Sequence, residues 1–112
     1  MVSYQEEGDW EVTPDGLYIA TRGFLIRRGY CCASRCRNCP YINWRNDPAW
    51  QPAPAECVRR MRVSPKAVAG AKAQLHAHEH RLTQCTVATE EKYHRAMARH
   101  YRWLLERWGA SR

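Results

Sequence analysis

Four of the six cysteines lie within nine residues, in the stretch from Cys31 to Cys39. Cys36 and Cys39 have the C-x2-C spacing of a half-site for a tetrahedral metal ion, because both thiolates leave one turn on the same side. Cys32 adds a third sulfur at C-x3-C spacing, four residues before Cys36. The fourth ligand stays open between Cys31, whose side chain diverges from that of its neighbour, and Cys57, which returns after a loop. The sequence therefore predicts a metal centre built from these residues.

Zinc and an iron–sulfur cluster both fit such a set of thiols. A closed zinc site stabilises small domains that have thin cores. The pair Cys39-Pro40, at the end of a tight cysteine run, is instead a feature of ferredoxins, and the C-x3-C-x2-C spacing matches the radical-SAM signature. A barrel around a radical-SAM cluster needs far more than 112 residues. Zinc is therefore the first prediction and an iron–sulfur cluster the alternative.

Other uses of the cysteines are weaker fits. A disulfide knot is typical of secreted proteins, and the acidic first residues are unlike a secretory leader. A C-x-x-C redox pair needs a strand-to-helix context, whereas Pro40 and a loop follow Cys39. Unligated thiols are the remaining alternative. Cys85 lies on an apolar helical stripe and is most simply a small buried side chain.

A family resemblance covers about residues 15–41. The motif DGL, then an apolar strand, a short helix and RGYCC-x3-CR-x-CPY, resembles a small uncharacterised cysteine-rich domain of unknown function. The matching positions in this chain are Arg28, Gly29, Tyr30, Cys31, Cys32, Cys36, Arg37, Cys39, Pro40 and Tyr41. The resemblance implies that the four clustered cysteines act together, and it brings no known activity.

Short elements must deliver the chain to the cysteines. Residues 10–12 and 17–20 predict two strands around the turn Thr13-Pro14-Asp15-Gly16, in which proline presets φ and glycine allows a positive φ. Thr21 is the predicted N-cap of a helix over residues 22–28, which the following glycine ends. A linker rich in proline and tryptophan follows the cysteine loop.

Two longer helices are predicted after the linker. Ser64 and Pro65 form a helix start, and that helix runs to about Cys85. Thr89 is the predicted N-cap of a last helix, which Gly109 ends. Apolar stripes run along both helices, at Val68, Ala71, Leu75, His78, Leu82 and Cys85 and at Tyr93, Met97, Tyr101, Leu104, Leu105 and Trp108. Two such amphipathic helices joined by a short loop predict an antiparallel helical hairpin.

The predicted fold class is α+β: a small N-terminal β-hairpin and a short helix feed a cysteine-rich metal-binding loop, and a C-terminal antiparallel helical hairpin follows. Residues 1–62 form the cysteine-rich region with its linker, and residues 63–112 form the helical hairpin.

Charge is divided unevenly along the chain. Residues 1–20 carry five acidic side chains and no Lys or Arg, whereas residues 21–112 carry all 18 basic side chains against six acidic ones, a net +12. Such a surplus predicts an anionic partner, with nucleic acid first; a solvated surface is the alternative. The predicted phosphate-contacting residues are Arg59, Arg60, Arg62, Arg95, Arg99 and Arg102.

The pattern favours a non-enzymatic, cytoplasmic protein. The sequence holds no glycine-rich phosphate loop, nucleophile elbow or paired carboxylates, and no apolar run reaches the roughly 18 residues of a membrane span. His76 and His80 share a helix face and are a lesser candidate metal pair. Three hypotheses follow: a zinc-stabilised module that binds nucleic acid or a nucleoprotein complex, an iron–sulfur protein in electron transfer or redox sensing, and a structural subunit that docks through Trp44, Trp50 and the C-terminal helices.

Overall fold

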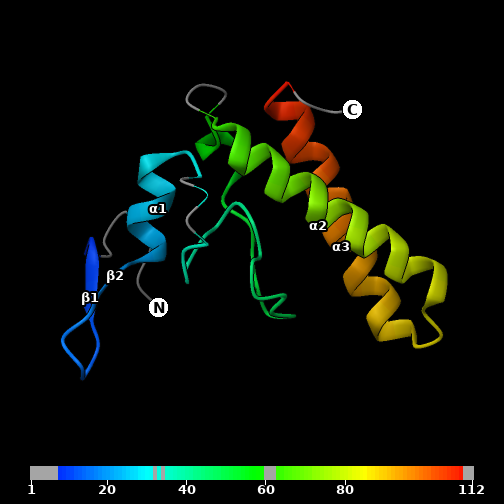
Figure 1. The fold of residues 1–112 in the computed structure, drawn as a ribbon, viewed down its shortest axis with the longest axis horizontal. Helices are drawn as coiled ribbons and strands as arrows, with labels where there is room; N and C mark the ends of the chain where they lie inside the picture. The colour runs from blue at the N-terminus through cyan, green and yellow to red at the C-terminus, as the bar shows by residue number, and fades with distance from the viewer. Residues whose placement is uncertain (1–7, 32, 34, 60–62, 110–112) are drawn as a thin grey trace.

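The fold is α+β, as predicted. The computed structural model describes residues 8–31, 33, 35–59 and 63–109. Its elements in chain order are β1 (Trp10–Val12), β2 (Tyr18–Ala20), α1 (Arg22–Arg28), the 3-10 turn η1 (Ala55–Cys57), α2 (Pro65–Gln84) and α3 (Ala88–Arg107). The β-hairpin and α1 lie on one side of the molecule and the α2–α3 hairpin on the other, with the cysteine loop and the linker between them (Figure 1).

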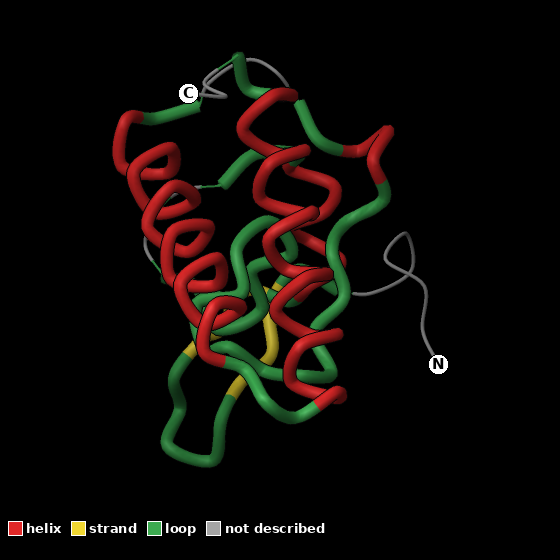
Figure 2. Tube along the Cα trace, turned by 90° about the vertical axis from the view of Figure 1, so that its right-hand side faces the viewer, coloured by secondary structure: helices red, strands yellow, loops and turns green. Residues whose placement is uncertain are grey.

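The β-hairpin follows the turn chemistry of the sequence. β1 and β2 pair antiparallel, with Trp10 opposite Ala20 and Val12 opposite Tyr18. Gly16 adopts φ 83°, in the left-handed region that glycine enters without steric cost. This hairpin projects from the looped middle of the chain (Figure 2).

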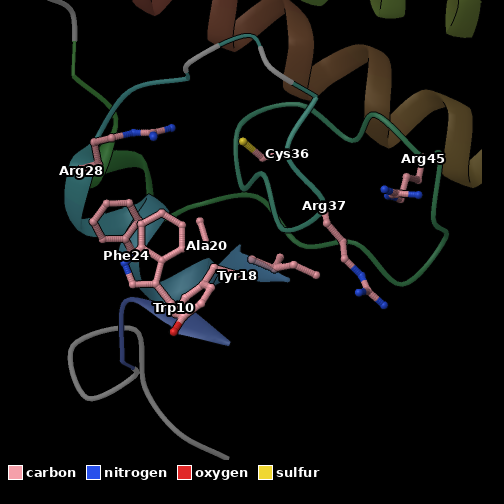
Figure 3. A pocket seen from close by; sticks show the side chains of 9 residues that line it. Trp10, Tyr18, Ala20, Phe24, Arg28, Cys36, Arg37 and Arg45 are labelled. Carbon is pink, nitrogen blue, oxygen red and sulfur yellow. The ribbon is translucent and has the colours of Figure 1, made fainter. Parts of the chain in front are cut away.

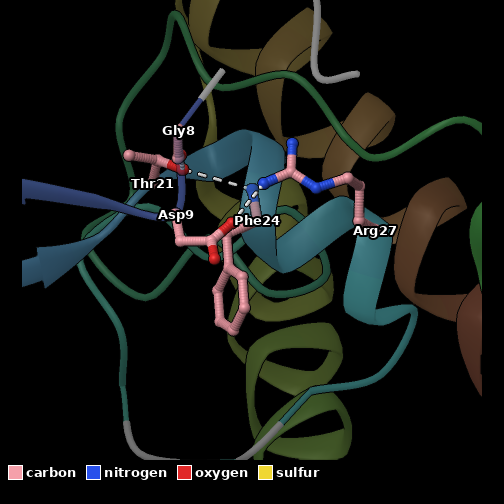
Figure 4. Close-up of polar contacts among 5 residues, drawn as sticks. All are labelled: Gly8, Asp9, Thr21, Phe24 and Arg27. Atoms are coloured by element: carbon pink, nitrogen blue, oxygen red, sulfur yellow. Dashed lines mark hydrogen bonds and ion pairs between the residues drawn. The ribbon is translucent and has the colours of Figure 1, made fainter. Parts of the chain in front are cut away.

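Helix α1 is held at both ends by the residues that the sequence predicts. The Thr21 hydroxyl accepts the N–H of Phe24 at 3.2 Å and donates to the carbonyl of Gly8, while Arg27 pairs with Asp9 at 2.7 Å (Figure 4). Gly29 ends the helix at φ 85°. These contacts tie the start of the hairpin to α1, so the hairpin and α1 form one unit beside the cysteine loop.

Helices α2 and α3 form the predicted antiparallel hairpin. Ser64 caps α2 by accepting the N–H of Ala67 at 3.1 Å, with proline in the first turn. The predicted Thr89 cap is wrong: α3 already begins at Ala88, and its N-cap is Val87, which makes no side-chain cap bond. Packing of the apolar stripe of α3 against α2 compensates for the stability that is lost because the cap is missing.

One hydrophobic cluster joins the cysteine loop to the helical hairpin. Its buried members come from α1, from the loop and linker, and from both long helices: Ile26, Cys31, Cys39, Tyr41, Ile42, Ala53, Val58, Ala67, Ala71, Met97, Tyr101, Leu104 and Leu105. The predicted apolar stripe of α3 is therefore confirmed as its buried face. Within the described residues, no helix combines the length and the apolar character that crossing a membrane requires.

A buried histidine lies in the interface between α2 and α3. His78 stacks on Tyr101 with ring centroids 5.9 Å apart, and its Nδ1 lies 2.8 Å from Nδ1 of His94. Burial, together with the positive charges of His94 and Arg81, lowers the pKa of His78 to about 4. His78 is therefore neutral in the folded protein at neutral pH, whereas His76 and His80 on the same helix are exposed.

We expect His78 to make folding stability depend on pH. The unfolded histidine takes up a proton at about pH 6.5, but the folded one does so only at about pH 4, so its contribution is complete above pH 6.5 and is lost as the pH falls toward 4. His78→Phe, which keeps the stacking on Tyr101, should reduce the slope of unfolding free energy against pH in that window by up to about 1.4 kcal/mol per pH unit. Urea unfolding at several pH values measures the slope. Exposed His80→Phe is the control, and equal slopes for wild type and His78→Phe contradict the expectation.

Candidate metal centre

The chain enters the cysteine loop through a series of left-handed residues. Gly29 turns the chain out of α1, and the non-glycine residues Ala33 and Arg35 follow with φ of 61° and 54°. Such residues cost of order 1 kcal/mol or more each and persist where the surroundings hold them in place. The tight turns of the loop are therefore held by the surrounding structure and not by the local backbone preferences of these residues.

Cys31 and Cys39 bring their sulfur atoms together in this loop. The two Sγ atoms lie 3.9 Å apart, and both side chains are buried, at 3% and 5% exposure. A zinc–sulfur bond of about 2.3 Å puts two thiolates of a tetrahedral site about 3.8 Å apart. The observed separation therefore fits two ligands of one ion.

Each of these sulfur atoms also accepts a main-chain N–H. Ala33 donates to Cys31 Sγ at 3.3 Å, and Ile42 donates to Cys39 Sγ at 3.4 Å. Hydrogen bonds of this kind stabilise the charged form of a thiol. The hydrogen bond from Cys31 lowers the pKa of Cys39 from its ordinary 9.0 to about 7, with help from N–H groups of Ile42 and Tyr41 and against the effect of burial. A thiolate, the form that binds metal, is thus accessible near neutral pH.

The indole of Trp44 offers a further donor. Its N–H also favours the Cys39 thiolate, but it lies outside hydrogen-bond geometry and is buried without a partner in the described part of the chain. Buried polar groups are normally paired. A charged sulfur at Cys39 gives this N–H a favourable electrostatic partner, so the surroundings fit a thiolate better than a neutral thiol.

Residues 40–43 anchor the cysteine loop to α1. Tyr41 is fully buried, and its hydroxyl donates to the carbonyl of Leu25 at 2.5 Å, near the end of α1. Burial, with the negative charge of Cys39 adding to it, raises the pKa of Tyr41 well above its ordinary range, so the hydroxyl stays a donor. Cys39 is therefore two residues from a fixed point.

The same segment is anchored to α3 from the other side. The main-chain N–H of Asn43 donates to the Tyr101 hydroxyl at 2.9 Å, and His100 Nε2 lies 2.8 Å from the carbonyl of Tyr41. A carbonyl only accepts, so His100 must carry its proton on Nε2. Trp50 donates its indole N–H to the carbonyl of Cys39 at 2.8 Å. Bonds from α3 and the linker thus fix the main chain at Cys39 and just after it.

The other cysteines are distributed as follows. Cys36 and Cys57 are partly buried and pack against the same cluster, and the chain just after Cys57 is held to the loop entrance by a bond from the N–H of Arg59 to the carbonyl of Gly29 at 2.9 Å. Cys32 lies outside the described residues. Cys85 ends α2 at the tip of the helical hairpin, away from the loop (Figure 1).

The described residues bring together two thiols of the predicted set. Among them, no group of three His, Cys, Asp or Glu side chains is arranged to hold a metal ion, and the cysteines that the structure describes form no disulfide. The C-x2-C half-site that the sequence favours is a turn closed by the N–H of Cys39 and the carbonyl of Cys36 at 3.2 Å. Cys31 and Cys39 are a sulfur pair at metal-ligand separation.

The predicted phosphate-contacting arginines that the structure describes lie on α3, where Arg95 and Arg99 line one pocket, and at the entrance of the cysteine loop. Arg95 pairs with Glu91 at 2.5 Å and Arg102 with Glu79 at 2.8 Å, both at exposed positions, while Arg99 is exposed nearby on α3. Arg59 lies at the loop entrance, where its side chain covers Gly29. Arg60 and Arg62 lie outside the described residues.

The two linker tryptophans have contacts inside the molecule. Trp50 makes an edge-on contact with His100, with ring centroids 5.1 Å apart. The Trp44 ring lies so close to Gly70 of α2 that a Cβ at that position would meet it at 2.4 Å. Docking of a partner through these side chains stays a prediction.

Sequence comparison adds one finding. Residues 3–46 match the model of a family of unknown function (DUF5522). The resemblance to an uncharacterised family is thus confirmed for a segment of the chain. The matched segment contains Cys31, Cys32, Cys36 and Cys39 but not Cys57. No curated protein and no solved structure gives a significant match.

Sequence reasoning missed the residues that hold the site in place. Asn43 and His100 carry no recognisable motif, because their role depends on contacts across 58 and 59 residues. Tyr41 belongs to the family motif, but nothing in its neighbours predicts that its hydroxyl would reach α1.

We expect Tyr41→Phe to loosen the cysteine loop. The substitution keeps the buried ring but removes the hydroxyl that donates to Leu25, and the loss of one such bond costs about 1–2 kcal/mol. Denaturant unfolding measures the difference. The control is Tyr18→Phe, at an exposed position of β2, where the change should be below about 0.5 kcal/mol. Equal stability for Tyr41→Phe and wild type contradicts the anchoring role.

Proposed function

We propose that the chain is a small non-enzymatic module in which a thiolate-bound metal ion, zinc in the first place, holds the cysteine loop, and that its basic remainder binds an anionic partner, nucleic acid or a nucleoprotein complex. The observation that carries the metal half is the 3.9 Å separation of Cys31 Sγ and Cys39 Sγ in a buried position. The N–H groups directed at both sulfur atoms support it.

The geometry favours a single ion over a large cluster. In a four-iron cluster each cysteine binds a different iron, which keeps cysteine sulfur atoms further apart than the edge of one tetrahedron. Cys31 and Cys39 lie at the edge length of one tetrahedron. Zinc binds such sets without redox chemistry, so its role here is structural.

The two remaining ligands of a tetrahedral site come from among Cys32, Cys36 and Cys57. Cys36 is on the same loop as the sulfur pair, and the segment of Cys57 is bonded to the loop entrance through Arg59 and Gly29. An ion shared by these residues would cross-link the loop to the linker. A domain of 112 residues has a modest core, so such a cross-link contributes a large share of its stability.

The partner half rests on charge. Residues 21–112 carry a net +12, and α3 presents Arg95, Arg99 and Arg102 at exposed positions. The ion pairs of Arg95 and Arg102 are exposed, and such pairs contribute only about 0–1 kcal/mol. A phosphate can therefore replace Glu91 or Glu79 as the partner of these guanidinium groups at little cost.

We expect one zinc ion per chain in protein purified under anaerobic conditions. Cys39→Ser and Cys31→Ser should each lose most of the metal and lower the melting temperature, because each removes one ligand of the pair. Cys85→Ser, at the far end of α2, is the matched control and should keep both. Elemental analysis and thermal unfolding with and without a chelator measure the outcome.

The same serine scan at Cys32, Cys36 and Cys57 identifies the ligands that complete the site. A brown protein with absorbance near 400 nm and iron in place of zinc would select the cluster alternative. A full equivalent of metal in Cys39→Ser, or none in zinc-supplied wild type, contradicts the metal half of the proposal.

Binding to oligonucleotides should weaken steeply with salt. Each phosphate contact on a single strand contributes about 0.7 to the slope of log affinity against log salt, so four to six contacts give a slope near −3 to −4 by the same rule. Fluorescence anisotropy with a labelled oligonucleotide between low and physiological salt measures this slope. Binding that does not depend on salt, or no binding to any nucleic acid, contradicts the partner half and leaves the metal half standing.

A further inference from the structure

A cavity of the described structure lies beside the cysteine loop and not among the arginines that the sequence singles out. Its volume is about 730 Å³, and it opens between the β-hairpin, α1 and the loop that carries Cys36. Figure 3 shows aromatic side chains gathered on one side of the cavity, with Arg37 and Arg45 on the other. The aromatic side suits a planar group of a ligand, and the arginine side suits an anionic group.

The aromatic side is a surface left open to solvent. Trp10 and Tyr18 are 54% and 71% exposed, and the strand register places both on one face of the hairpin, with Trp10 opposite Ala20 and Tyr18 opposite Val12. Behind them, Phe24 of α1 supports the Trp10 ring, with centroids 5.6 Å apart. A supported but exposed indole is a platform on which a planar group can stack.

The opposite side is positively charged without compensation. Arg37 and Arg45 line this side, Arg28 lines the cavity beside Phe24 with its guanidinium 6.0 Å from that ring centroid, and none of the described lining residues is acidic. Arg28 lies over the Tyr30 ring, with its guanidinium 4.9 Å from the centroid. Arg37 and Arg45 are exposed and make no hydrogen bond or ion pair with the part of the chain that the structure describes. Two guanidinium groups are thus available for an oxyanion.

We propose that this cavity binds a nucleotide unit of a single-stranded nucleic acid, with the base stacked on Trp10 and Tyr18 and the phosphate held by Arg37 and Arg45. Ligand pockets of about 300–1,000 Å³ are the usual size for such a group. A base in a duplex is already stacked on both faces, so only an unpaired base is free to use the platform. The inference rests on the partner half of the proposed function and not on the metal.

The test is fluorescence anisotropy with a labelled ten-nucleotide single strand and with the same sequence as a duplex, on metal-loaded wild-type protein. Trp10→Ala should weaken single-strand binding about 5- to 100-fold, because base–aromatic stacking is lost. Arg37→Gln combined with Arg45→Gln should weaken it and reduce the salt slope by about 1.4, which corresponds to two phosphate contacts.

Arg95→Gln combined with Arg99→Gln removes the α3 contacts of the proposed function for comparison. Matched controls are Trp103→Ala, an exposed tryptophan on α3, and Lys66→Gln combined with Lys72→Gln, at two exposed positions of α2, which remove one aromatic side chain and two positive charges from the helical hairpin. Both should leave single-strand binding within about twofold, which is the size of effect that a surface change has by itself. Thermal unfolding checks that every variant is folded. Should Trp10→Ala fail to fold, the variant with Arg37→Gln and Arg45→Gln still tests the inference.

The outcomes distinguish the cavity inference from the partner half of the proposed function. Salt-dependent binding that persists in the Trp10 and Arg37/Arg45 variants but is lost in the Arg95/Arg99 variant overturns the inference and leaves the proposed function intact. Equal affinity for duplex and single strand also overturns it, because an unpaired base is then not recognised. Competition by a free mononucleotide as effective as that by the oligonucleotide, per nucleotide unit, assigns the cavity to a small ligand and overturns the strand assignment. No binding of any nucleic acid by wild type overturns both claims.

Discussion

The buried segment from Pro40 to Asn43 is the constraint on which the rest of this structure depends. Its main chain and the Tyr41 side chain are bonded to α1 on one side and to α3 on the other, through Leu25, His100 and Tyr101. A buried segment without regular secondary structure must satisfy its polar groups with specific partners. Because those partners belong to two different helices, the segment orders the helices and the cysteine loop at the same time.

The position of the Cys39 sulfur follows from this constraint. Cys39 immediately precedes the anchored segment, and its carbonyl and sulfur both receive N–H donors from residues that the segment positions, Trp50 and Ile42. The proposed metal site therefore lies next to a main-chain segment that packing and hydrogen bonds hold in place. The cavity on the other side of the loop shares that framework through Cys36 and Arg37, so the proposed metal site and the proposed ligand site lie on the same short loop.

The sequence allowed much of the local structure to be predicted. The turn before Gly16, the Thr21 cap, the stop at Gly29 and the Ser64-Pro65 start are confirmed, because each depends on the backbone preference of one or two residues. The start of α3 was predicted too late, since packing against α2 stabilises a first turn that has no capping side chain. For the candidate site, the buried pair Cys31 and Cys39 belongs to the predicted cysteine set, whereas the C-x2-C spacing had drawn attention to Cys36 and Cys39.

By itself the sequence determined the elements, their order and the concentration of sulfur and positive charge, because turns, caps and amphipathic stripes are encoded within a few residues. Only the tertiary structure decided which sulfur atoms meet and which arginines share a cavity. Cys31 and Cys39 approach because the chain between them passes through left-handed residues, and because the segment just after Cys39 is anchored by side chains almost 60 residues away. Contacts across such distances depend on how the helices pack, and no local pattern of residues records that.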